Sequence, residues 1–341
     1  MKALKLLLVE DDQRVEREYQ EVLEAYVEER DRPICMPVKT KLSDAISSLD
    51  ESLDAAIIDL NLGNDTSDGG KVIEEVKRHF RVPVAVLTAT PADAVNEPPV
   101  VGIYTKGKHR FEQVLDRLWD IYEVGLTKIM GGRGLLEERL NEIFLKNLVP
   151  TIDVWIEYAK HENERTKKAL LRYALGHLVA ELEGDETPCY PEEFYLAPPL
   201  KDSLQTGTLV QHKEETTCHV VMTPACDLVM RNGEPKTDVV VVAEVVPENL
   251  LFKKLQANSS RRAKLRKNGD SYCYHWLPEA QGVTGGFVDF GRLKTVRWKE
   301  FDDTFDRLNA RIAPSFIKDI VSRFSTFYAR QGQPAIVEHG G

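Results

Sequence analysis

The sequence lacks any long uninterrupted run of apolar residues. No run among its 341 residues approaches the ~20 residues that a membrane-spanning helix requires. The first residues, MKALKLLLVEDD, hold two lysines and a short apolar run, but acids follow at once and no small-residue cleavage site is present. We therefore expect neither membrane insertion nor a signal peptide.

The sequence also lacks a cysteine framework. Its five cysteines form no CxxC pair, and their number is odd. They are scattered along the chain, at Cys35, Cys189, Cys218, Cys226 and Cys273. Such a set indicates reduced thiols and a cytoplasmic location.

Net positive charge is missing as well. The chain has 45 Lys and Arg residues against 55 Asp and Glu residues, which gives a formal net charge of −10. This balance excludes an overall electrostatic attraction to nucleic acid, but it leaves room for a local basic patch.

One such patch is the segment KKLQANSSRRAKLRKNG, residues 253–269, which contains no acid. A solvated loop or helix is one interpretation, and contact with phosphate backbones is the other. The aromatic residues of YCYHW, just beyond it, fit either single-stranded nucleic acid or core packing. The candidate nucleic-acid contacts are Arg261, Arg262, Lys264, Arg266 and Lys267.

The first 125 residues alternate between short apolar segments and amphipathic ones. Apolar segments at residues 6–9, 53–63, 82–90 and 100–107, together with PICMPV, predict five strands. Between most of them, apolar residues recur at three- and four-residue spacing, as in helices that cover a sheet. This order predicts an α/β fold with a doubly wound parallel sheet.

Polar residues occupy the carboxyl ends of these strands, where parallel sheets gather their functional groups. Glu10 and Asp11 follow the first strand, and Asp59 follows the third. Thr88 ends the fourth strand, and Lys106 follows the fifth. Carboxylate oxygens clustered in this way suit a hard divalent cation such as Mg²⁺. A carboxylate beside that cation can accept a phosphoryl group, which the hydroxyl and the ammonium would then hold.

The segments LLLVEDD, AAIIDLNL, VPVAVLTAT and YTKG, in this order, resemble the receiver domains of two-component response regulators. The resemblance covers residues 1–125 and implies a five-stranded flavodoxin-like sheet. It also implies that the protein is phosphorylated by a sensor histidine kinase, with Mg²⁺ as cofactor, in a phosphorelay.

Carried over position by position, the resemblance implies that Asp59 is the phosphoacceptor. Glu10 and Asp11 would bind the metal together with Asp59 and the backbone carbonyl of Asn61. Thr88 would be the switch hydroxyl, and Lys106 the phosphate-binding lysine. Asp12 is left as the N-cap of the following helix.

The segment also departs from the family pattern. Gly107 follows Lys106 where the family usually has a proline, and Gly63 replaces another common proline. Ile103 stands at the position of the aromatic switch residue, and Tyr104 beside it should point to the other face of its strand. The three prolines in residues 89–105 exclude a full fourth helix, so the usual route by which receivers report phosphorylation is altered.

Residues 126–184 predict a helical linker or hairpin. Four glycines in GLTKIMGGRG separate it from the preceding unit, and Pro150 should bend or divide its helices. A hairpin packed on the next domain and a dimerising signal helix are the two interpretations, and the second implies a homodimer.

Residues 185–341 predict an α+β output domain with a small β-barrel or a strongly curved antiparallel sheet. Strand-like segments rich in β-branched residues extend to VRW, and helices are expected at residues 300–308 and 313–332. This part resembles no characterised output domain.

A candidate site in this domain combines Cys226, Asp227, His275 and Asp289 as a thiol or acid–base site. The alternative is structural, with Cys226 as a small buried group and Asp227 in a turn. Zinc bound by Cys218, His219, Cys226, Cys273 and His275 is a weaker interpretation, because the spacing matches no standard ligand pattern.

We therefore expect a response regulator with an atypical output domain. A receiver-gated effector enzyme, nuclease-like and related to defence, is one alternative; a non-enzymatic adaptor that uses the receiver for docking is another.

Overall fold

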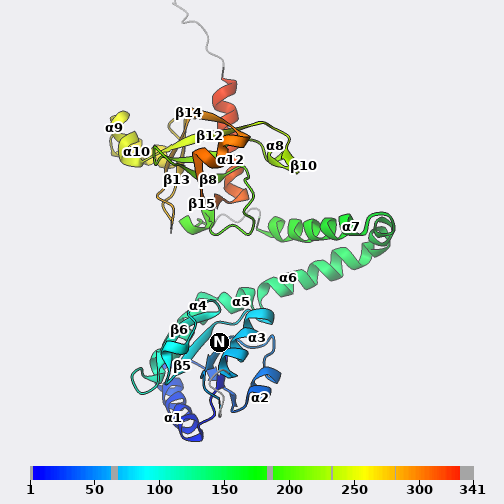
Figure 1. Ribbon diagram of the computed structural model, residues 1–341, viewed down its shortest axis with the longest axis vertical. Helices are drawn as coiled ribbons and strands as arrows, with labels where there is room; N and C mark the ends of the chain where they lie inside the picture. The colour runs from blue at the N-terminus through cyan, green and yellow to red at the C-terminus, as the bar shows by residue number, and fades with distance from the viewer. Residues whose placement is uncertain (1–2, 63–67, 183–186, 232, 281, 331–341) are drawn as a thin grey trace, which may run out of the picture. The chain divides into compact units, whose positions relative to one another are not determined.

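The computed structural model describes residues 3–62, 68–182, 187–231, 233–280 and 282–330. The chain divides between residues 185 and 186 into two compact units, the N-terminal unit and the C-terminal unit (Figure 1). Among the described helices, none is both long enough and apolar enough to cross a membrane.

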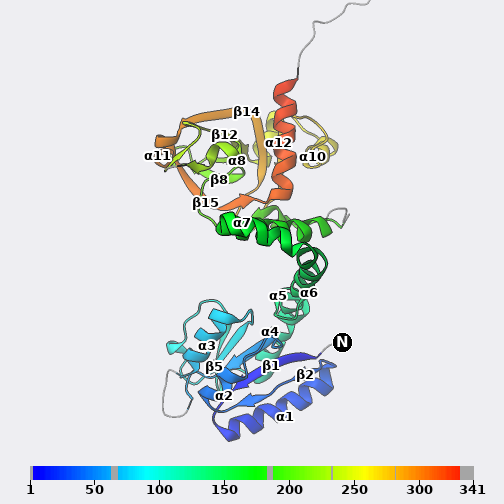
Figure 2. The same ribbon diagram turned by 90° about the vertical axis from the view of Figure 1, so that its right-hand side faces the viewer.

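A parallel sheet forms the centre of the N-terminal unit (Figure 2). Its strand order is β2-β1-β4-β5-β6, and β2 and β3 are two short pieces that pair with β1 along the same edge. The strands are β1 (Leu4–Val9), β2 (Ile34–Cys35), β3 (Val38–Lys39), β4 (Ala55–Ile58), β5 (Val84–Thr88) and β6 (Val100–Thr105). The five strand positions and their parallel pairing confirm the predicted fold class.

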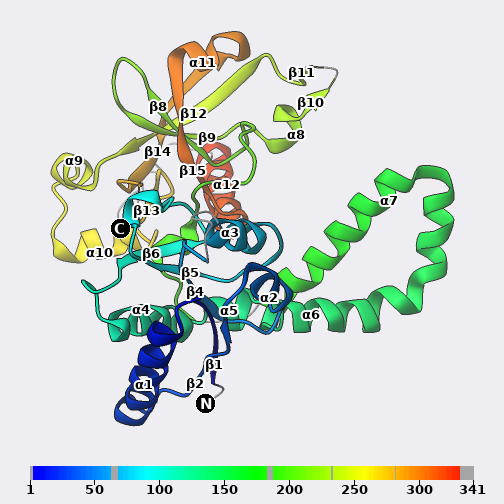
Figure 3. The ribbon, with the colours of Figure 1, turned by 60° about the horizontal axis from the view of Figure 1, so that its bottom comes forward.

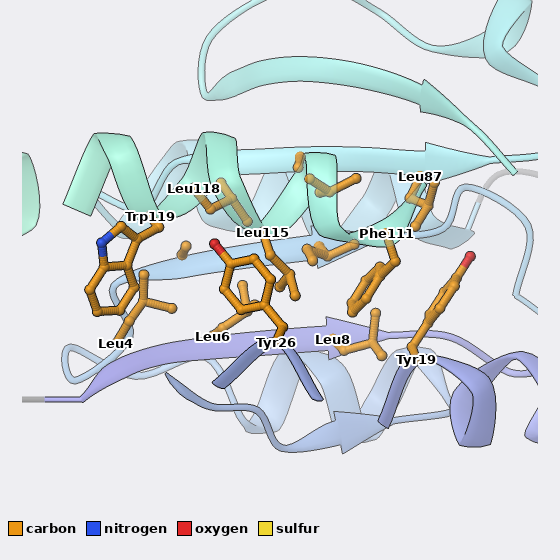
Figure 4. Packing of buried hydrophobic residues seen from close by; sticks show 14 of the residues in the cluster. Leu4, Leu6, Leu8, Tyr19, Tyr26, Leu87, Phe111, Leu115, Leu118 and Trp119 are labelled. Carbon is orange, nitrogen blue, oxygen red and sulfur yellow. The ribbon is translucent and has the colours of Figure 1, made fainter. Parts of the chain in front are cut away.

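One face of this sheet packs against α1 (Gln13–Arg30) and α4 (Phe111–Val124). Figure 4 shows Leu4, Leu6 and Leu8 of β1 beneath aromatic and aliphatic side chains of both helices. The rings of Tyr19 and Phe111 stack there, with their centroids 4.2 Å apart. Alternation along β1 sends the intervening Leu7 and Val9 to the other face.

The opposite face packs against α2 (Leu42–Ser47) and α3 (Asp68–His79). Both faces of the central strands are therefore covered, which explains why these strands are continuous apolar runs rather than alternating ones. Asp12 is the N-cap of α1 and accepts a hydrogen bond from the Arg14 backbone nitrogen at 2.8 Å, as the sequence predicts.

No helix covers the far end of this second face. Residues 89–99, all of which are described, hold one 3₁₀ turn, Pro91–Asp93, between β5 and β6. This confirms the expectation that the prolines prevent a fourth helix. As a consequence β6 is half-buried along its whole length, whereas β5 is fully buried.

Helices continue after α4, which ends at Gly125 in the left-handed conformation (φ 89°). They are α5 (Leu126–Met130), α6 (Leu135–Ile143), a π-helical turn (Phe144–Leu148), a 3₁₀ turn (Val149–Thr151) and α7 (Ile152–Glu181). Pro150 lies in the 3₁₀ turn, as expected. The backbone of Glu162 leaves the helical region (φ −144°, ψ 73°), and there α7 reverses direction (Figure 3).

The C-terminal unit is built on a seven-stranded antiparallel sheet with the order β13-β14-β12-β9-β8-β15-β7. Its strands are β7 (Tyr195–Leu196), β8 (Thr208–His212), β9 (Cys218–Val221), β12 (Val239–Val246), β13 (Tyr274–Leu277), β14 (Gly286–Arg297) and β15 (Phe305–Ile312). A separate two-stranded ribbon joins β10 (Met230–Arg231) to β11 (Glu234–Pro235).

The two edges of the seven-stranded sheet approach each other. The buried hydroxyl of Tyr195 in the edge strand β7 donates to the carbonyl of Pro278, just after the opposite edge strand β13, at 2.7 Å. The sheet is therefore strongly curved and almost closed, in agreement with the predicted barrel-like or curved sheet.

Five helices flank this sheet: α8 (Ala225–Leu228), α9 (Glu248–Lys254), α10 (Ser259–Arg266), α11 (Phe301–Thr304) and α12 (Pro314–Ala329). Helix α12 confirms the last predicted helix. The helix predicted at residues 300–308 is confirmed only in its first half, as α11; its second half is wrong, because the chain forms β15 after Thr304. Phe305, Ala310 and Ile312 are buried in the sheet, so tertiary burial overrides the local helical pattern.

Candidate functional site

Parallel pairing brings four strand ends of the N-terminal unit to one rim. Val9, the last residue of β1, lies opposite Ile58, the last residue of β4, and the Asp59 backbone nitrogen donates to the Val9 carbonyl at 3.0 Å. On the other side, Thr88 of β5 lies opposite Thr105 of β6. The polar residues that follow these strands therefore begin at the same level of the sheet.

Three carboxylates converge on this rim. Oxygen atoms of Glu10, Asp11 and Asp59 lie within 4.8 Å of one another. Glu10 and Asp59 are buried at 1% and 5% exposure, whereas Asp11 reaches solvent. Carboxylates this close repel one another, so the cluster requires a cation.

Lys106 supplies positive charge from β6. Its Nζ lies 2.6 Å from Oε2 of Glu10 and 2.6 Å from Oδ2 of Asp59. Burial works against the ammonium, but the hydrogen bonds to Asp59 and Glu10 outweigh it, so the pKa of Lys106 is raised. Burial also raises the pKa of Glu10, and Lys106 only partly offsets this effect.

A chain of polar contacts connects Asp59 and Asn61, in the segment after β4 that is called the acceptor loop below, to the end of β5. The Asn61 backbone nitrogen donates to Oδ1 of Asp59 at 3.3 Å, and its side-chain amide donates to Oγ1 of Thr90 at 3.2 Å. The Thr90 backbone nitrogen donates to the buried hydroxyl oxygen of Thr88 at 3.3 Å. Thr88 is therefore linked to Asp59 through two residues, and Thr90 is a member that the sequence did not single out.

The residues of the rim fit a hard divalent cation. All donors are oxygen atoms, and three of them are carboxylates. The buried Oδ1 of Asn61 has no hydrogen-bond partner among the described residues. An additional oxygen beside the carboxylate cluster therefore has a lone pair that no described donor satisfies. The backbone carbonyl of Asn61 stays the predicted ligand from this residue.

A second feature that the sequence did not single out is the close approach of α3 to this loop. A Cβ atom added to Gly69 would lie 2.0 Å from the carbonyl oxygen of Asp59, whereas one added to Gly70 would meet nothing within 4 Å. The Gly69 backbone nitrogen also donates to the carbonyl of Leu60 at 3.0 Å. Only glycine allows this contact, and the GG pair in the sequence is its one visible signal.

The departures from the family pattern have structural consequences. Gly107 takes a left-handed conformation (φ 74°), which a proline cannot adopt. Tyr104 packs with the core between the sheet and α1 and α4, and its ring lies over Gly102. Ile103 lies on the half-buried strand β6, at the position where the resemblance implies an aromatic switch residue. Gly63 lies outside the described residues.

In the C-terminal unit, Cys226 and Asp227 lie together at the start of α8. The thiol of Cys226 is 3.6 Å from Oδ1 of Asp227, and Lys236 donates to the same oxygen at 2.7 Å. This hydrogen bond to Lys236 lowers the pKa of Asp227. Cys226 is exposed, which contradicts the structural alternative of a small buried group.

The structure does not bring His275 and Asp289 together. His275 lies opposite Val288 in the β13–β14 pair, and Asp289 lies opposite Tyr274. Residues directly opposite share a face of the sheet, and successive residues alternate, so the two side chains are on opposite faces. No hydrogen bond joins either of them to Cys226 or Asp227 within the described chain.

Asp289 is instead tied into its own surroundings. Its Oδ1 accepts from the Gly291 backbone nitrogen at 2.9 Å and from the thiol of Cys273 at 3.5 Å. Lys254 and Arg292 each approach Oδ2 at 3.6 Å. Burial and the neighbouring Asp289 raise the pKa of Cys273, so this thiol is not activated as a nucleophile.

The zinc interpretation finds no support in the described residues. The carboxylate cluster of the N-terminal unit is the one place in these ranges where three or more His, Cys, Asp or Glu side chains converge. Cys218, His219, Cys226, Cys273 and His275 do not form such a group.

The basic segment forms α10, and its arginines have partners within the unit. Arg261 donates to Asp270 and Arg266 to Glu248, with closest distances of 3.1 Å and 2.6 Å. Arg262 donates to the Ala257 carbonyl at 2.9 Å. The two lysines, Lys264 and Lys267, are exposed. The arginines thus serve packing, which weakens the argument for contact with phosphate backbones.

The aromatic residues beyond this segment also belong to the packing. Trp276 donates through Nε1 to Glu248 at 2.7 Å, and its backbone nitrogen donates to the side chain of Asn268. Tyr274 and Trp276 pack against the core beneath α9 and α10, whereas Tyr272 is exposed.

Comparison with known proteins gives structural similarity for the N-terminal part of the chain, over 34–37% of its length in the three matches described below. No protein-family model and no curated protein sequence matches it. Solved structures of receiver domains are similar to the N-terminal part of the chain. Their sequence identities are low, so the similarity describes the fold alone.

A CheY-like response regulator receiver domain from Methylobacillus flagellatus is 18% identical, with a TM-score of 0.29, over 34% of this chain and 99% of that one. A signal receiver domain of a LuxO repressor protein from Vibrio parahaemolyticus is 19% identical, with a TM-score of 0.28, over 37% of this chain and 92% of that one. The response regulator TrrA from Thermotoga maritima, solved in complex with Mg²⁺–BeF, is 17% identical, with a TM-score of 0.26, over 34% of this chain and 98% of that one.

The strand order and the residues at the rim define the N-terminal unit as a receiver-type α/β domain. The C-terminal unit matches no named output domain.

Proposed function

We propose that the protein is a response regulator that accepts a phosphoryl group on Asp59 from a sensor histidine kinase. The observation that carries this proposal is the carboxylate cluster of Glu10, Asp11 and Asp59, with Lys106 bound to two of its members. A structural ion pair alone would not account for a third acid, Asp11, beside the two that Lys106 already binds.

In the proposed reaction, Oδ of Asp59 attacks the phosphorus of a phosphohistidine. The new O–P bond forms as the N–P bond breaks, and the electron pair stays on the ring nitrogen. The imidazole leaves as the neutral ring because the other ring nitrogen of the phosphohistidine carries a proton. Mg²⁺, held by Glu10, Asp11, Asp59 and the backbone carbonyl of Asn61, would neutralise phosphoryl oxygens.

The chain's own residues then hold the product. Lys106 loses one carboxylate charge as Asp59 becomes an acyl phosphate, and its N–H groups donate instead to a phosphoryl oxygen. The hydroxyl of Thr88 accepts from Thr90 in the structure and is free to donate to another phosphoryl oxygen. A shift of Thr88 moves Thr90 and hence the segment between β5 and β6.

This segment is the proposed exit of the signal. It contains no helix, and a hollow beside it is lined by Ile73 of α3 and by Val95, Pro98 and Val100. The surface by which many receivers contact their output is therefore replaced by an open groove next to Leu60 and the acceptor loop. We place the protein in the cytoplasm, where its cysteines stay reduced.

Mass spectrometry after treatment with a small phosphate donor and Mg²⁺ tests the proposal. The wild-type chain should gain one phosphoryl group, Asp59→Asn should gain none, and Asp11→Asn should gain it far more slowly. Asp12→Asn is the matched control, because it changes a neighbouring acid that caps α1 and should leave the gain intact. Absence of the gain in wild type, or its persistence in Asp59→Asn, would refute the assignment.

A further inference from the structure

Exposed large hydrophobic side chains are concentrated in the helical segment that follows α4. More than half of those in the described chain lie between residues 124 and 182. A surface of this kind is unusual in a protein that acts as a monomer in water, because each exposed apolar group forgoes the gain of burial.

The segment from α6 to the end of α7 is a helical hairpin with two arms. Arm 1 comprises residues 135–161, and arm 2 comprises residues 163–182, on the two sides of the kink at Glu162. Figure 3 shows the helical segment doubling back on itself. Arg139 Nε lies 2.6 Å from Oε1 of Glu181, which joins the base of the hairpin. Trp155 and Tyr173 pack between the arms with ring centroids 5.6 Å apart.

Each arm carries an apolar stripe with spacings of four, three and four residues. The arm 1 stripe consists of Leu145, Val149, Ile152 and Ile156, which are 43–56% exposed. The arm 2 stripe consists of Leu171, Leu175, Leu178 and Leu182; three of these are 49–72% exposed, and Leu178 is half-buried. On an α-helix this spacing gives the seam by which helices pack in coiled coils and bundles. Arm 2 is α-helical along its stripe, whereas in arm 1 Ile152 and Ile156 lie in α7, and Leu145 and Val149 lie in the π-helical and 3₁₀ turns before it.

The exposed apolar area is large enough for a stable dimer. A fully buried Val, Leu or Ile side chain removes roughly 60–120 Å² from water, so the eight stripe residues, about half-exposed, offer a few hundred square ångströms. A standard protein interface buries about 800 Å² per partner. With Phe144, Val154 and Tyr158 also about half-exposed, the hairpin reaches this range.

A second copy of the hairpin is the occupant that fits both stripes at once. Two hairpins related by a twofold axis would form a four-helix bundle, an arrangement in which all four stripes can face the centre. A partner with a single groove or helix would cover one stripe and leave the other in water.

The charges beside the stripes also favour self-association. Asp153 and Glu157 lie on arm 1, where Glu157 also pairs with Lys160 of the same arm at 2.6 Å, and Lys168 and Arg172 lie on arm 2. In a twofold bundle arm 1 of one copy runs beside arm 2 of the other, so acids of one copy face bases of the other in both halves of the interface.

We propose that the α6–α7 hairpin pairs with the hairpin of a second copy of this chain in a four-helix bundle, and so makes the protein a homodimer. The association depends on the two apolar stripes and requires neither phosphorylation nor nucleic acid. It thus stands or falls independently of the reaction at Asp59.

Light scattering of the full-length protein across a dilution series tests the proposal. Wild type should have twice the 38.7 kDa mass of one chain, and the double variant Leu171→Glu/Leu175→Glu should dissociate about 100-fold more readily, because each buried charge costs about tenfold in affinity. The matched control is Val229→Glu/Leu250→Glu, which places the same charges on exposed apolar positions of the C-terminal unit. The control should keep the wild-type mass.

Helical circular dichroism and hydrogen exchange distinguish a lost interface from a lost fold. The monomeric variant should keep its helicity while residues 145–182 exchange faster than in wild type. A wild-type monomer, or a dimer indifferent to Leu171→Glu/Leu175→Glu, would overturn the proposal. A wild-type monomer with strong protection of both stripes would show that another part of the same chain covers them, and this too would overturn it.

Discussion

The ammonium of Lys106 lies 2.6 Å from the carboxylate of Asp59, and both groups are largely removed from water. The contact joins β6 to the end of β4 across β5. Because Glu10 shares the same ammonium, one cation balances two buried acids. The stability of the rim should therefore depend on the charge of Lys106, and this dependence can be measured without a kinase.

Replacing Lys106 by Met should destabilise the N-terminal unit by about 3 kcal/mol, because Glu10 and Asp59 would face each other without their cation. Added Mg²⁺ should recover part of the loss, since a cation that binds only the folded rim stabilises it by mass action. Hydrogen exchange in β1 and β4 measures both effects. Lys108→Met, at an exposed lysine two residues away, is the control and should change neither.

Gly69→Ala should destabilise α3 and the acceptor loop by about 3 kcal/mol, because the new methyl group would overlap the Asp59 carbonyl. Gly70→Ala should instead stabilise the unit by about 0.5–1 kcal/mol, since it gains helix propensity in open space. Hydrogen exchange in α3 measures both changes. Equal effects of the two substitutions would contradict the close contact.

Acid should loosen the C-terminal unit through His275. Burial, with a smaller contribution from Arg323, lowers the pKa of this imidazole to about 3. Its Nδ1 has no hydrogen-bond partner among the described residues, and Oδ2 of Asp319 on α12 lies 3.6 Å away. At pH values between about 3 and the free-histidine pKa of about 6.5, His275 is protonated in the unfolded chain but not in the folded chain.

The direction of the pH dependence follows from this difference in proton binding between the folded and unfolded chain. The contribution of His275 to stability is fully present above pH ~6.5 and falls by about 1.4 kcal/mol for each pH unit below it. The local opening free energy of β13 and β14, measured by hydrogen exchange at several pH values, should show this slope. His275→Asn should reduce the pH dependence of this opening free energy by the amount that one bound proton contributes. His161→Asn, at an exposed histidine of α7, should leave the pH dependence unchanged.

Tyr195→Phe should destabilise the C-terminal unit by about 1–2 kcal/mol. The substitution leaves the Pro278 carbonyl without its donor in a buried position where the sheet edges meet. Tyr272→Phe removes a hydroxyl from an exposed ring of the same unit and serves as the control. A thermal midpoint equal for the two variants would show that the edge contact adds nothing to stability.

Much of the structure of the N-terminal unit can be predicted from the sequence, because the features that specify its strands lie close together in the chain. Short apolar runs give the strands, and the residue directly after each strand falls on one rim whatever the details of packing. Glu10, Asp11, Asp59, Thr88 and Lys106 were found in this way. Thr90 and Gly69 were not, because their roles depend on which neighbouring loop approaches them.

The structure of the C-terminal unit is harder to predict from the sequence, because its contacts join residues far apart in the chain. Asp227 pairs with Lys236, whereas His275 and Asp289 fall on opposite faces of β13 and β14. Their chemical types suggested a common pocket, but only register decides which face a side chain takes. The segment after Thr304 has a helical pattern and forms β15 because β8 and β7 lie on its two sides.

The sequence by itself determined the parallel sheet and the order of acids, hydroxyl and lysine along its rim, since strand ends and their neighbours are fixed by local pattern. Only the tertiary structure decided that Lys106 binds two carboxylates at once, that Asn61 and Thr90 link Asp59 to Thr88, and that the hairpin arms leave two stripes exposed. These features depend on distances between separate elements, and packing, not chain order, sets those distances.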